Sequence, residues 1–375
     1  MSLTMCRVCA NPLSQPDFDR PAPAQSSIRT VLPVATQVYV CRMCGHVQSP
    51  DLPALKDFYD TQYRISLDVD GHDQLYENAA GEQVFRTQYQ AEIIGRLDVP
   101  QGARVLDFGA GKATTLQRFA DLRPDVDAHV FDVSSDYVDH WNTWVQPGNQ
   151  ATYTLPEEWV GRFDFITAHF VLEHVAAPVE VLESLARALA PGGRVFFSVP
   201  NVETNTGDLL VVDHLSHFTR PSLERFLARA GLLAERIDED LFHGAFVVVA
   251  RSGENQPVTQ PNPSHLTDVL VRWQALLDNL ATRKLEGPVA IYGAGFYGSV
   301  IATCLAGQAS IFLDQNPYLQ GSTHLDLPVG HPGACPKDVR TVVVGLNPAR
   351  AHEILGDGSP WLPEGADLLF LDALA

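Results

Sequence analysis

One stretch constrains the fold more than any other, and it lies at residues 104–112, Arg-Val-Leu-Asp-Phe-Gly-Ala-Gly-Lys. Apolar residues typical of a buried strand end at an acid, Asp107, and two glycines, Gly109 and Gly111, follow it. A glycine has no Cβ, so its backbone can approach a ligand closely, and a helix start behind it offers unpaired N–H groups. We therefore expect the strand end and its loop, including Ala110, to form a cradle for a small molecule.

The acid indicates which small molecule fits. A nicotinamide dinucleotide would place its pyrophosphate over this loop, where Asp107 would repel it, and the third glycine of that fingerprint is absent. S-adenosylmethionine has no phosphate and carries a positive sulfur and an amino group, so the acid favours it. The next predicted strand, residues 129–132, ends in Asp132, at the position that binds ribose hydroxyls in such folds. We add Val133 and His169 to the predicted cofactor site; an ordinary strand–helix turn without a ligand is the alternative.

The rest of the central region alternates between strands and helices. A predicted strand at residues 163–169 delivers its end to the same edge of the sheet as Asp107 and Asp132, where ligands bind in open α/β folds. Two further strands near residues 233–237 and 245–249 complete a seven-stranded order. The sequence therefore predicts a Rossmann-like α/β domain over residues 59–252.

Four of the six cysteines form two Cys-x-x-Cys pairs, Cys6 with Cys9 and Cys41 with Cys44. Two such pairs can bind one Zn²⁺ tetrahedrally, and four sulfur ligands leave no open position for chemistry. We expect a structural zinc module over residues 1–58, with a redox dithiol as the alternative.

A second glycine loop lies near the C-terminus. Residues 253–285 read as a linker followed by a packing helix, and Gly293 to Gly298 then complete a Gly-x-Gly-x-x-Gly pattern, with Asp314 21 residues after the first glycine. Alone, this pattern indicates a dinucleotide. Only one further clear strand is predicted, so we expect residues 286–375 to form a Rossmann-like half-domain that contributes packing, and an NAD-dependent oxidoreductase is the alternative.

The net charge and the hydropathy of the chain exclude some classes of binding partner. Acids exceed bases by 45 to 26, a net charge of −19, which repels nucleic acid and anionic membranes. No apolar run approaches eighteen residues, and the N-terminus has no basic-then-apolar signal. We expect a cytoplasmic enzyme with a small-molecule substrate and no nucleic-acid or membrane partner; the oligomeric state is not predicted.

Three motifs carry a resemblance. Val-Leu-Asp-Phe-Gly-Ala-Gly at residues 105–111, Leu-Glu-His-Val at 172–175 and Leu-Ala-Pro-Gly-Gly at 189–193 resemble those of class I S-adenosylmethionine-dependent methyltransferases. Together with the paired cysteines and the terminal glycine loop, the chain is similar to nucleotide-sugar C-methyltransferases. That resemblance implies methylation of a carbon next to the ketone of a nucleotide-linked deoxy-keto sugar.

The resemblance also implies catalytic residues. His214 matches the proposed base of that family, Asp213 stands where the family has Glu, and His174 matches a second pocket histidine. A carbon next to a ketone must lose a proton before it can attack, and a histidine can accept it near neutral pH. Sequence adjacency alone does not pair Asp213 with His214, because neighbours in a strand or turn point apart; Asp213 can instead orient His217 or bind substrate.

Three alternatives stay open at this stage. Each histidine can be a hydrogen-bonded structural residue, the reaction can be O- or N-methylation of another metabolite, and the chain can be a non-catalytic nucleotide-binding scaffold. A polar, aromatic segment before the first strand of the cofactor domain adds Tyr63 and Tyr76 as candidates for a lid over the pocket.

Overall fold

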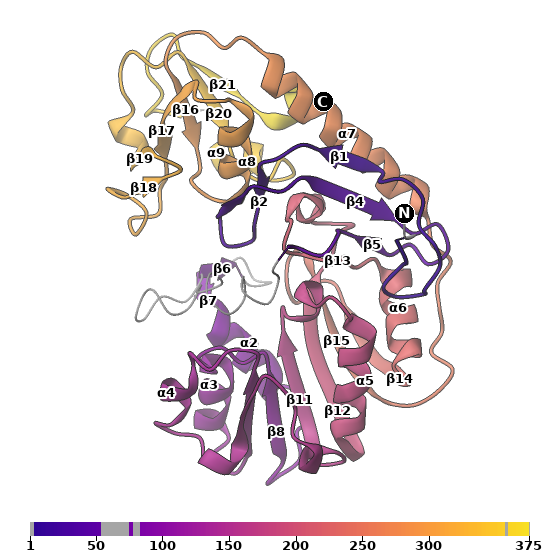
Figure 1. Ribbon diagram of the computed structural model, residues 1–375. Helices are drawn as coiled ribbons and strands as arrows, with labels where there is room; N and C mark the ends of the chain where they lie inside the picture. Colours follow the sequence, from indigo (N-terminus) through magenta and orange to yellow (C-terminus); the bar gives the residue numbers. More distant parts are fainter. Residues whose placement is uncertain (1–3, 54–74, 78–82, 357–358, 375) are drawn as a thin grey trace. The chain divides into compact units, whose positions relative to one another are not determined.

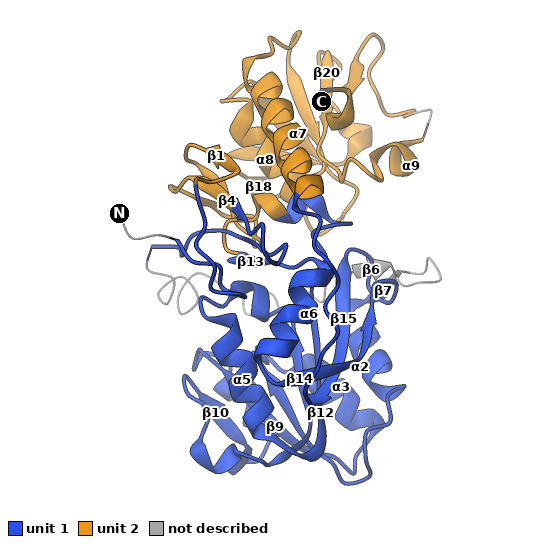
Figure 2. Cartoon of the chain, turned by 90° about the vertical axis from the view of Figure 1, so that its right-hand side faces the viewer, with its two compact units in different colours: residues 1–14, 39–208, 214–263 blue, residues 15–38, 209–213, 264–375 orange. Residues whose placement is uncertain are grey.

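A computed structural model describes residues 4–53, 75–77, 83–356 and 359–374 (Figure 1). Tyr63 lies outside these residues, and of Tyr76 only the backbone is described. The chain forms two compact units (Figure 2): unit 1 is Met1–Ser14, Tyr39–Asp208 and His214–Pro263, and unit 2 is Gln15–Val38, Leu209–Asp213 and Ser264–Ala375. These units differ from the four predicted segments, chiefly because residues 15–38 group with unit 2; the four-part division stays a prediction.

Unit 1 is built on a seven-stranded sheet, as predicted. Its first five strands in spatial order are parallel, and the sixth, β15, is antiparallel to both of its neighbours. The spatial order is β10 (Gln150–Thr152), β9 (Asp127–Asp132), β8 (Arg104–Phe108), β11 (Phe163–His169), β12 (Leu189–Pro200), β15 (Ala245–Ser252) and β14 (Leu232–Asp238).

Helices cover both faces of this sheet because consecutive strand residues point to opposite sides. Val105 packs in a cluster with residues of α2 (Arg86–Gly95), α3 (Thr114–Leu122) and α4 (Val138–Trp141). Leu106 packs in the other cluster, with residues of α5 (Pro178–Ala188) and α6 (Arg220–Arg229). Each large apolar side chain that is fully buried contributes about 1.5–3 kcal/mol.

Short strands pair within each unit. In unit 2, β1 (Phe18–Arg20) pairs antiparallel with the first residues of β4 (Thr36–Val40). In unit 1, Tyr39 and Val40 at the end of β4 pair antiparallel with β5 (Val47–Gln48), whose other neighbour is β13 (Ser216–His217). Within unit 1, β5 pairs antiparallel with β13, so that Val47 lies opposite His217. The residues just after the second cysteine pair are thereby hydrogen-bonded to a segment of the predicted catalytic loop.

Unit 2 contains a six-stranded sheet rather than the few strands predicted. The order is β18 (Thr323–His324), β19 (Leu327–Gly330), β17 (Ala309–Leu313), β16 (Val289–Tyr292), β20 (Thr341–Val344) and β21 (Asp367–Leu369). All neighbours are parallel except β18 and β19. Its helices are α7 (Pro263–Thr282), α8 (Phe296–Cys304) and α9 (Ala351–Leu355).

The remaining strands are short. They form two antiparallel pairs, β2 (Ala24–Gln25) with β3 (Val31–Leu32) and β6 (Leu75–Glu77) with β7 (Gln83–Phe85). Among the residues the structure describes, no helix has both the length and the apolar character needed to cross a membrane.

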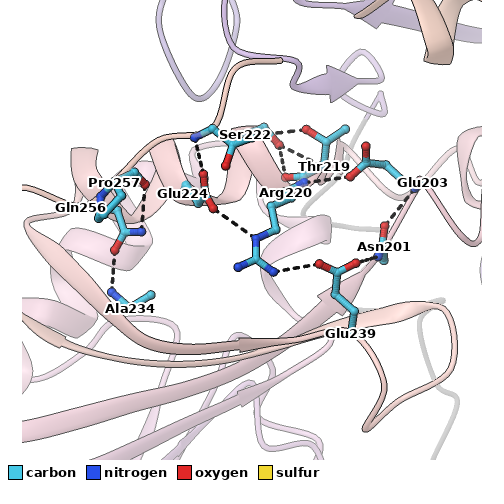
Figure 3. Close-up of polar contacts among 11 residues, drawn as sticks. Asn201, Glu203, Thr219, Arg220, Ser222, Glu224, Ala234, Glu239, Gln256 and Pro257 are labelled. Carbon is cyan, nitrogen blue, oxygen red and sulfur yellow. Dashed lines mark hydrogen bonds and ion pairs between the residues drawn. The ribbon is translucent and has the colours of Figure 1, made fainter. Parts of the chain in front are cut away.

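A polar network fixes the start of α6, directly after the predicted catalytic loop (Figure 3). Thr219 and Ser222 form a reciprocal capping box, in which each side chain accepts a backbone N–H of the other residue. Arg220 contacts Glu224 at 3.1 Å and Glu239 at 2.9 Å. Capping groups of this kind satisfy N–H groups that a helix leaves unpaired.

The segment predicted as a linker is also anchored. The Gln256 side chain accepts the N–H of Ala234 at 2.7 Å (Figure 3), and Glu224 accepts the N–H of Thr259 at 2.6 Å. Residues before α7 are therefore hydrogen-bonded to β14 and α6 of unit 1.

The capping box generates a prediction. Thr219→Ala removes the side chain that accepts the Ser222 N–H, and loss of an N-cap costs about 1 kcal/mol. We expect amide hydrogen exchange in residues 220–229 to accelerate about fivefold, since about 1.4 kcal/mol corresponds to tenfold. The exposed Thr154, changed to Ala, serves as the control and should leave this exchange unchanged; equal rates in the two variants would contradict the prediction.

Candidate active site

The loop after β8 has the backbone geometry that the glycine pattern predicts. Gly109, Gly111 and Ala113 all have positive φ, at +71°, +53° and +58°. A Cβ on Gly109 would come within 2.5 Å of the Val171 side chain, so a larger residue does not fit there. Ala113 is the N-cap residue of α3, which begins at Thr114.

Most backbone N–H groups of this loop donate hydrogen bonds to other groups of the protein. Gly109 and Ala110 both donate to the carbonyl of Phe131, at 2.9 and 3.0 Å, and Gly111 donates to the Asp132 carboxylate at 2.9 Å. A pyrophosphate needs such N–H groups as donors. The loop is therefore better suited to a ligand that uses the carboxylates than to a dinucleotide.

Two carboxylates lie under this loop, as predicted. Asp132 is buried, and burial raises its pKa against hydrogen bonds from Gly111 and Ser134. Asp107 is also buried and accepts a hydrogen bond from Thr167 at 2.8 Å. Burial first, and the charge of Asp132 second, raise the pKa of Asp107 to about 7.

The two buried carboxylates with raised pKa values fit the charge of S-adenosylmethionine. A buried carboxylate without a cation resists ionisation, and a nearby positive charge reverses that. The sulfonium and amino groups of S-adenosylmethionine provide positive charge. Asp107, Asp132 and the glycine loop therefore fit this cofactor, and they would hold it.

The two other predicted cofactor residues flank these carboxylates in sequence or strand order. Val133 directly follows Asp132 and is exposed. His169 ends β11, the strand beside β8. Both ring nitrogens of His169 are buried without a hydrogen-bond partner among the described residues, and burial lowers its pKa to about 3. His169 is thus a neutral imidazole; its contact with cofactor stays a prediction.

The structure brings the two predicted pocket histidines together. The rings of His174 and His214 lie 4.7 Å apart in an edge-to-face arrangement. His174 ends a short helical turn, Leu172–His174, after β11, and His214 follows the turn Thr206–Leu210 after β12. Both are nearly buried, with 9% of each residue exposed.

Asp208 is the carboxylate that holds His214, and sequence reasoning missed it. Its Oδ1 lies 2.6 Å from Nδ1 of His214, and its Oδ2 lies 2.7 Å from Nδ1 of His217. Burial opposes ionisation of Asp208, but the charges and hydrogen bonds of His214 and His217 outweigh burial and hold its pKa well below the usual value. The available signal was an acid six and nine residues before two histidines of one loop.

Asp213 is hydrogen-bonded to a serine of the N-terminal region. Its carboxylate accepts hydrogen bonds from the backbone N–H and the hydroxyl of Ser27, both at 2.6 Å. The expectation that Asp213 orients His217 is therefore wrong, since Asp208 does so. A catalytic role for Asp213 is left as a prediction without support from this geometry.

Glu173 is a second residue that the sequence did not single out. It is 1% exposed, and neither carboxylate oxygen has a hydrogen-bond partner among the described residues. Burial raises its pKa to about 7. One oxygen of Glu173 and one nitrogen each of His174 and His214 lie within 4.8 Å of one another, so a carboxyl group that stays protonated up to about pH 7 lies beside both histidines.

The four predicted zinc ligands converge. One Sγ atom from each of Cys6, Cys9, Cys41 and Cys44 lies within 4.8 Å of the others, with separations of 3.6 Å for Cys6 and Cys44 and 3.5 Å for Cys9 and Cys41. A tetrahedral Zn²⁺ with Zn–S bonds of about 2.3 Å places its sulfurs about 3.8 Å apart. The donor set and its spacing therefore fit a closed zinc site.

In the second glycine loop, in unit 2, the first and third glycines have a packing reason. A Cβ on Gly298 would collide with the carbonyl oxygen of Gly293, and one on Gly293 would come within 2.7 Å of the Gly345 carbonyl. The carboxylate of Asp314 accepts the N–H of Ala294 at 2.7 Å. Close approach of strands and helix thus accounts for Gly293 and Gly298, whereas a Cβ on Gly295 would meet no atom within 4 Å.

Comparisons with known proteins identify a methyltransferase domain in this chain. A family model described as a methyltransferase domain matches residues 83–235. A ubiquinone biosynthesis O-methyltransferase from Xanthomonas axonopodis pv. citri is 30% identical over 171 residues, which cover 40% of this chain and 70% of that protein. A protein of the same description from Xanthomonas oryzae pv. oryzae is 34% identical over 116 residues, and the match spans 47% of its length and 29% of this chain.

Solved structures are similar at lower identity. A SAM-dependent methyltransferase from Aquifex aeolicus is 19% identical with a TM-score of 0.36, and the match covers 44% of this chain and 91% of that one. A putative methyltransferase in complex with the Haloferax volcanii Trm112 activator is 18% identical with a TM-score of 0.39, over 45% and 91% of the two chains. On its strand order, its family match and its curated relative, the chain belongs to the class I S-adenosylmethionine-dependent methyltransferases.

Proposed function

We propose that this methyltransferase methylates a carbon next to the ketone of a nucleotide-linked sugar, with His214 as the base. One observation carries the proposal: the buried Asp208 carboxylate holds Nδ1 of His214 at 2.6 Å. An ionised carboxylate can only accept hydrogen bonds, so Nδ1 carries the proton and Nε2 carries the lone pair. This arrangement suits a general base.

The chemistry requires such a base. S-adenosylmethionine supplies an electrophilic methyl group on a positive sulfur. His214 would remove the proton from the carbon next to the ketone, and the resulting enolate carbon could then accept the methyl group, with the bonding electron pair left on the sulfur. The positive charge that develops on His214 then faces Asp208, which stabilises it; the proton is later released to water.

The surroundings of His214 support the same role. His174 lies against the base, and below about pH 7 the protonated Glu173 carboxyl adds no second negative charge. The environment thus shifts the pKa values of the two acids in opposite directions: Asp208 is ionised and orients the base, whereas Glu173 keeps its proton up to about pH 7.

O-methylation of another small metabolite is the second candidate. The curated relatives at 30% and 34% identity are described as O-methyltransferases of ubiquinone biosynthesis. A hydroxyl group also loses a proton to a base during methyl transfer, so His214 would act in the same way. The two reactions differ in whether a carbon-bound hydrogen exchanges.

We also propose that the cysteine cluster, Cys6, Cys9, Cys41 and Cys44, holds one structural Zn²⁺. Four thiolates fill a tetrahedral shell and leave no position for substrate or water. The metal would stabilise the N-terminal region and take no part in the chemistry.

The base can be tested with a thymidine diphosphate-linked 4-keto-6-deoxyhexose in D₂O, with S-adenosylhomocysteine in place of the methyl donor. We expect the wild type to exchange a hydrogen next to the ketone and His214→Asn to lose at least about a hundredfold in exchange rate. Calorimetry should show unchanged binding of S-adenosylhomocysteine. The exposed His265, changed to Asn, is the control.

Full exchange by His214→Asn would remove His214 as the base. Methylation of a hydroxyl substrate without any carbon-bound exchange would support the O-methyltransferase instead.

The raised pKa of Asp107 generates a second prediction. Its carboxyl is protonated below about pH 7 in the free protein, and a cationic ligand favours the ionised form, so binding releases a proton. Affinity for S-adenosylmethionine should therefore rise with pH, by up to tenfold per unit, between about pH 5.5 and 7. The stability of the ligand-free fold shows the opposite trend, because between about pH 4 and 7 the unfolded chain releases the Asp107 proton that the folded protein retains.

Calorimetry at several pH values checks this trend. Asp107→Asn should weaken binding at pH 7.5 and flatten the pH dependence, whereas Asp121→Asn, an exposed position on α3, should change neither. A steep dependence retained in Asp107→Asn would assign the titration to another group.

Metal analysis tests the zinc site. Purified protein should contain about one Zn²⁺ per chain, and Cys41→Ser should lose the metal and lower the melting temperature. Cys304→Ser and Cys335→Ser, at cysteines outside the cluster, should retain it. Absence of zinc from a folded wild type would contradict the site.

A further inference from the structure

Four buried polar groups form a continuous chain that ends at His214. The Ser49 hydroxyl lies 3.1 Å from Nε2 of His217, Nδ1 of His217 lies 2.7 Å from Asp208, and Asp208 lies 2.6 Å from Nδ1 of His214. Ser49, His217 and Asp208 are 1%, 0% and 3% exposed. The series Ser49, His217, Asp208 and His214 is here called the relay.

We propose that Ser49 and His217 are positioning residues that fix the ring orientation and basicity of His214. This inference rests on the proposed role of His214 as the base. Neither residue reaches the reacting atoms; both act through Asp208.

The hydrogen-bond inventory of the relay leaves one arrangement. Asp208 is ionised and accepts, so both histidines donate through Nδ1–H. His217 then has its lone pair on Nε2 and accepts the hydroxyl hydrogen of Ser49. Each oxygen of Asp208 has a separate histidine donor, so the carboxylate cannot rotate without breaking one bond, and His214 is held in one orientation.

The second donor also sets the charge that His214 feels. A hydrogen bond to Oδ2 disperses the negative charge of Asp208. Without His217, Oδ2 would be a buried and unpaired acceptor, and Asp208 would attract a proton on His214 more strongly. Loss of His217 should thus raise the pKa of His214 and keep it protonated, and inactive as a base, to higher pH.

The N-terminal region holds the far end of the relay. Ser49 donates its N–H to the carbonyl of Leu215 at 3.2 Å, and Arg7, between the first two cysteines, donates to the carbonyl of Ser49 at 3.0 Å. Arg7 also donates its N–H to the Gln48 side chain at 2.8 Å. These contacts keep the Ser49 hydroxyl facing His217.

Other ionisable groups lie near the relay, among them Arg86, which is close enough to Glu173 for their charges to interact. His174 and Glu173 lie beside His214, and the buried His46 is close enough to His217 for their charges to interact. Burial keeps the pKa of His46 at about 3 and raises that of Glu173 to about 7. His46 is therefore neutral at the pH of the test, and Glu173 is present in every variant.

Nitrogen NMR on the full chain with ¹⁵N-labelled histidine and bound S-adenosylhomocysteine tests the inference. In the wild type, we expect His214 and His217 to be protonated at Nδ1 when neutral. In His217→Phe, the pKa of His214 should rise by about one unit, a tenfold change in proton affinity. The acid limb of the sugar hydrogen exchange should move by the same amount, without a change in S-adenosylhomocysteine binding.

Two further variants separate positioning from packing. His217→Asn keeps an N–H donor near Oδ2 of Asp208 and should restore most of the wild-type titration, whereas Ser49→Ala should give a smaller shift of the same sign. Ser216→Ala is the matched control, because Ser216 is buried next to His217 and its hydroxyl has no hydrogen-bond partner among the described residues.

The outcomes distinguish a failure of the positioning role of Ser49 and His217 from a failure of His214 as the base. An unchanged His214 titration in folded His217→Phe, or in Ser49→Ala if the Phe variant does not fold, overturns the inference even when His214→Asn has lost exchange. Full exchange in His214→Asn overturns the proposed function instead. A general loss of stability in all variants, Ser216→Ala included, with no shift of the titration, shows a packing role only.

Discussion

The parallel pairing of β8 with β9 and β11 is the constraint on which the site depends. Parallel strands end at the same edge of a sheet, and the register here places Thr167 beside Asp107. That register explains the hydrogen bond from Thr167 to the Asp107 carboxylate. It also places Asp132, at the end of β9, where its carboxylate can accept the N–H of Gly111. A slip of one residue would turn each of these side chains to the opposite face.

Buried carboxylates in unit 1 are used in two ways, and their surroundings decide which. Asp208 has two histidine donors and is ionised. Asp107 has one neutral donor, and Glu173 has none among the described residues, so burial raises the pKa of both to about 7. An acid of the first kind can orient a base, whereas an acid of the second kind is suited to a cationic ligand or to remaining uncharged.

Local patterns predicted what depends on spacing along the chain. The glycine loop after β8 and the cysteine pairs are short motifs whose geometry follows from the residue types, and the seven strands follow from apolar runs. In unit 2, β19 and β21 were missed because they are three or four residues long and β19 contains Pro328. Such strands are stabilised by their neighbours in the sheet rather than by their own sequence.

The hydrogen bonds of the relay could not be predicted from local sequence patterns, for a different reason. Asp213 is adjacent to His214 in sequence, yet its carboxylate binds Ser27, and Asp208 reaches the histidine across a turn. Ser49 is 168 residues from His217. Side-chain pairs of this kind depend on how distant segments pack, and no spacing rule encodes that.

The position of the cysteine cluster suggests how a closed metal site can matter to chemistry that it does not touch. The N-terminal residues are too few to form a core alone, and Cys6, Cys41 and Cys44 pack in the same apolar cluster as α5 and α6. A metal there would fix the ends of the segments that carry Arg7 and β5, and both hold Ser49 in place. Because four sulfurs saturate the metal, its only route to His214 is through the position of these groups. An effect of zinc on the base would therefore be transmitted by hydrogen-bond geometry.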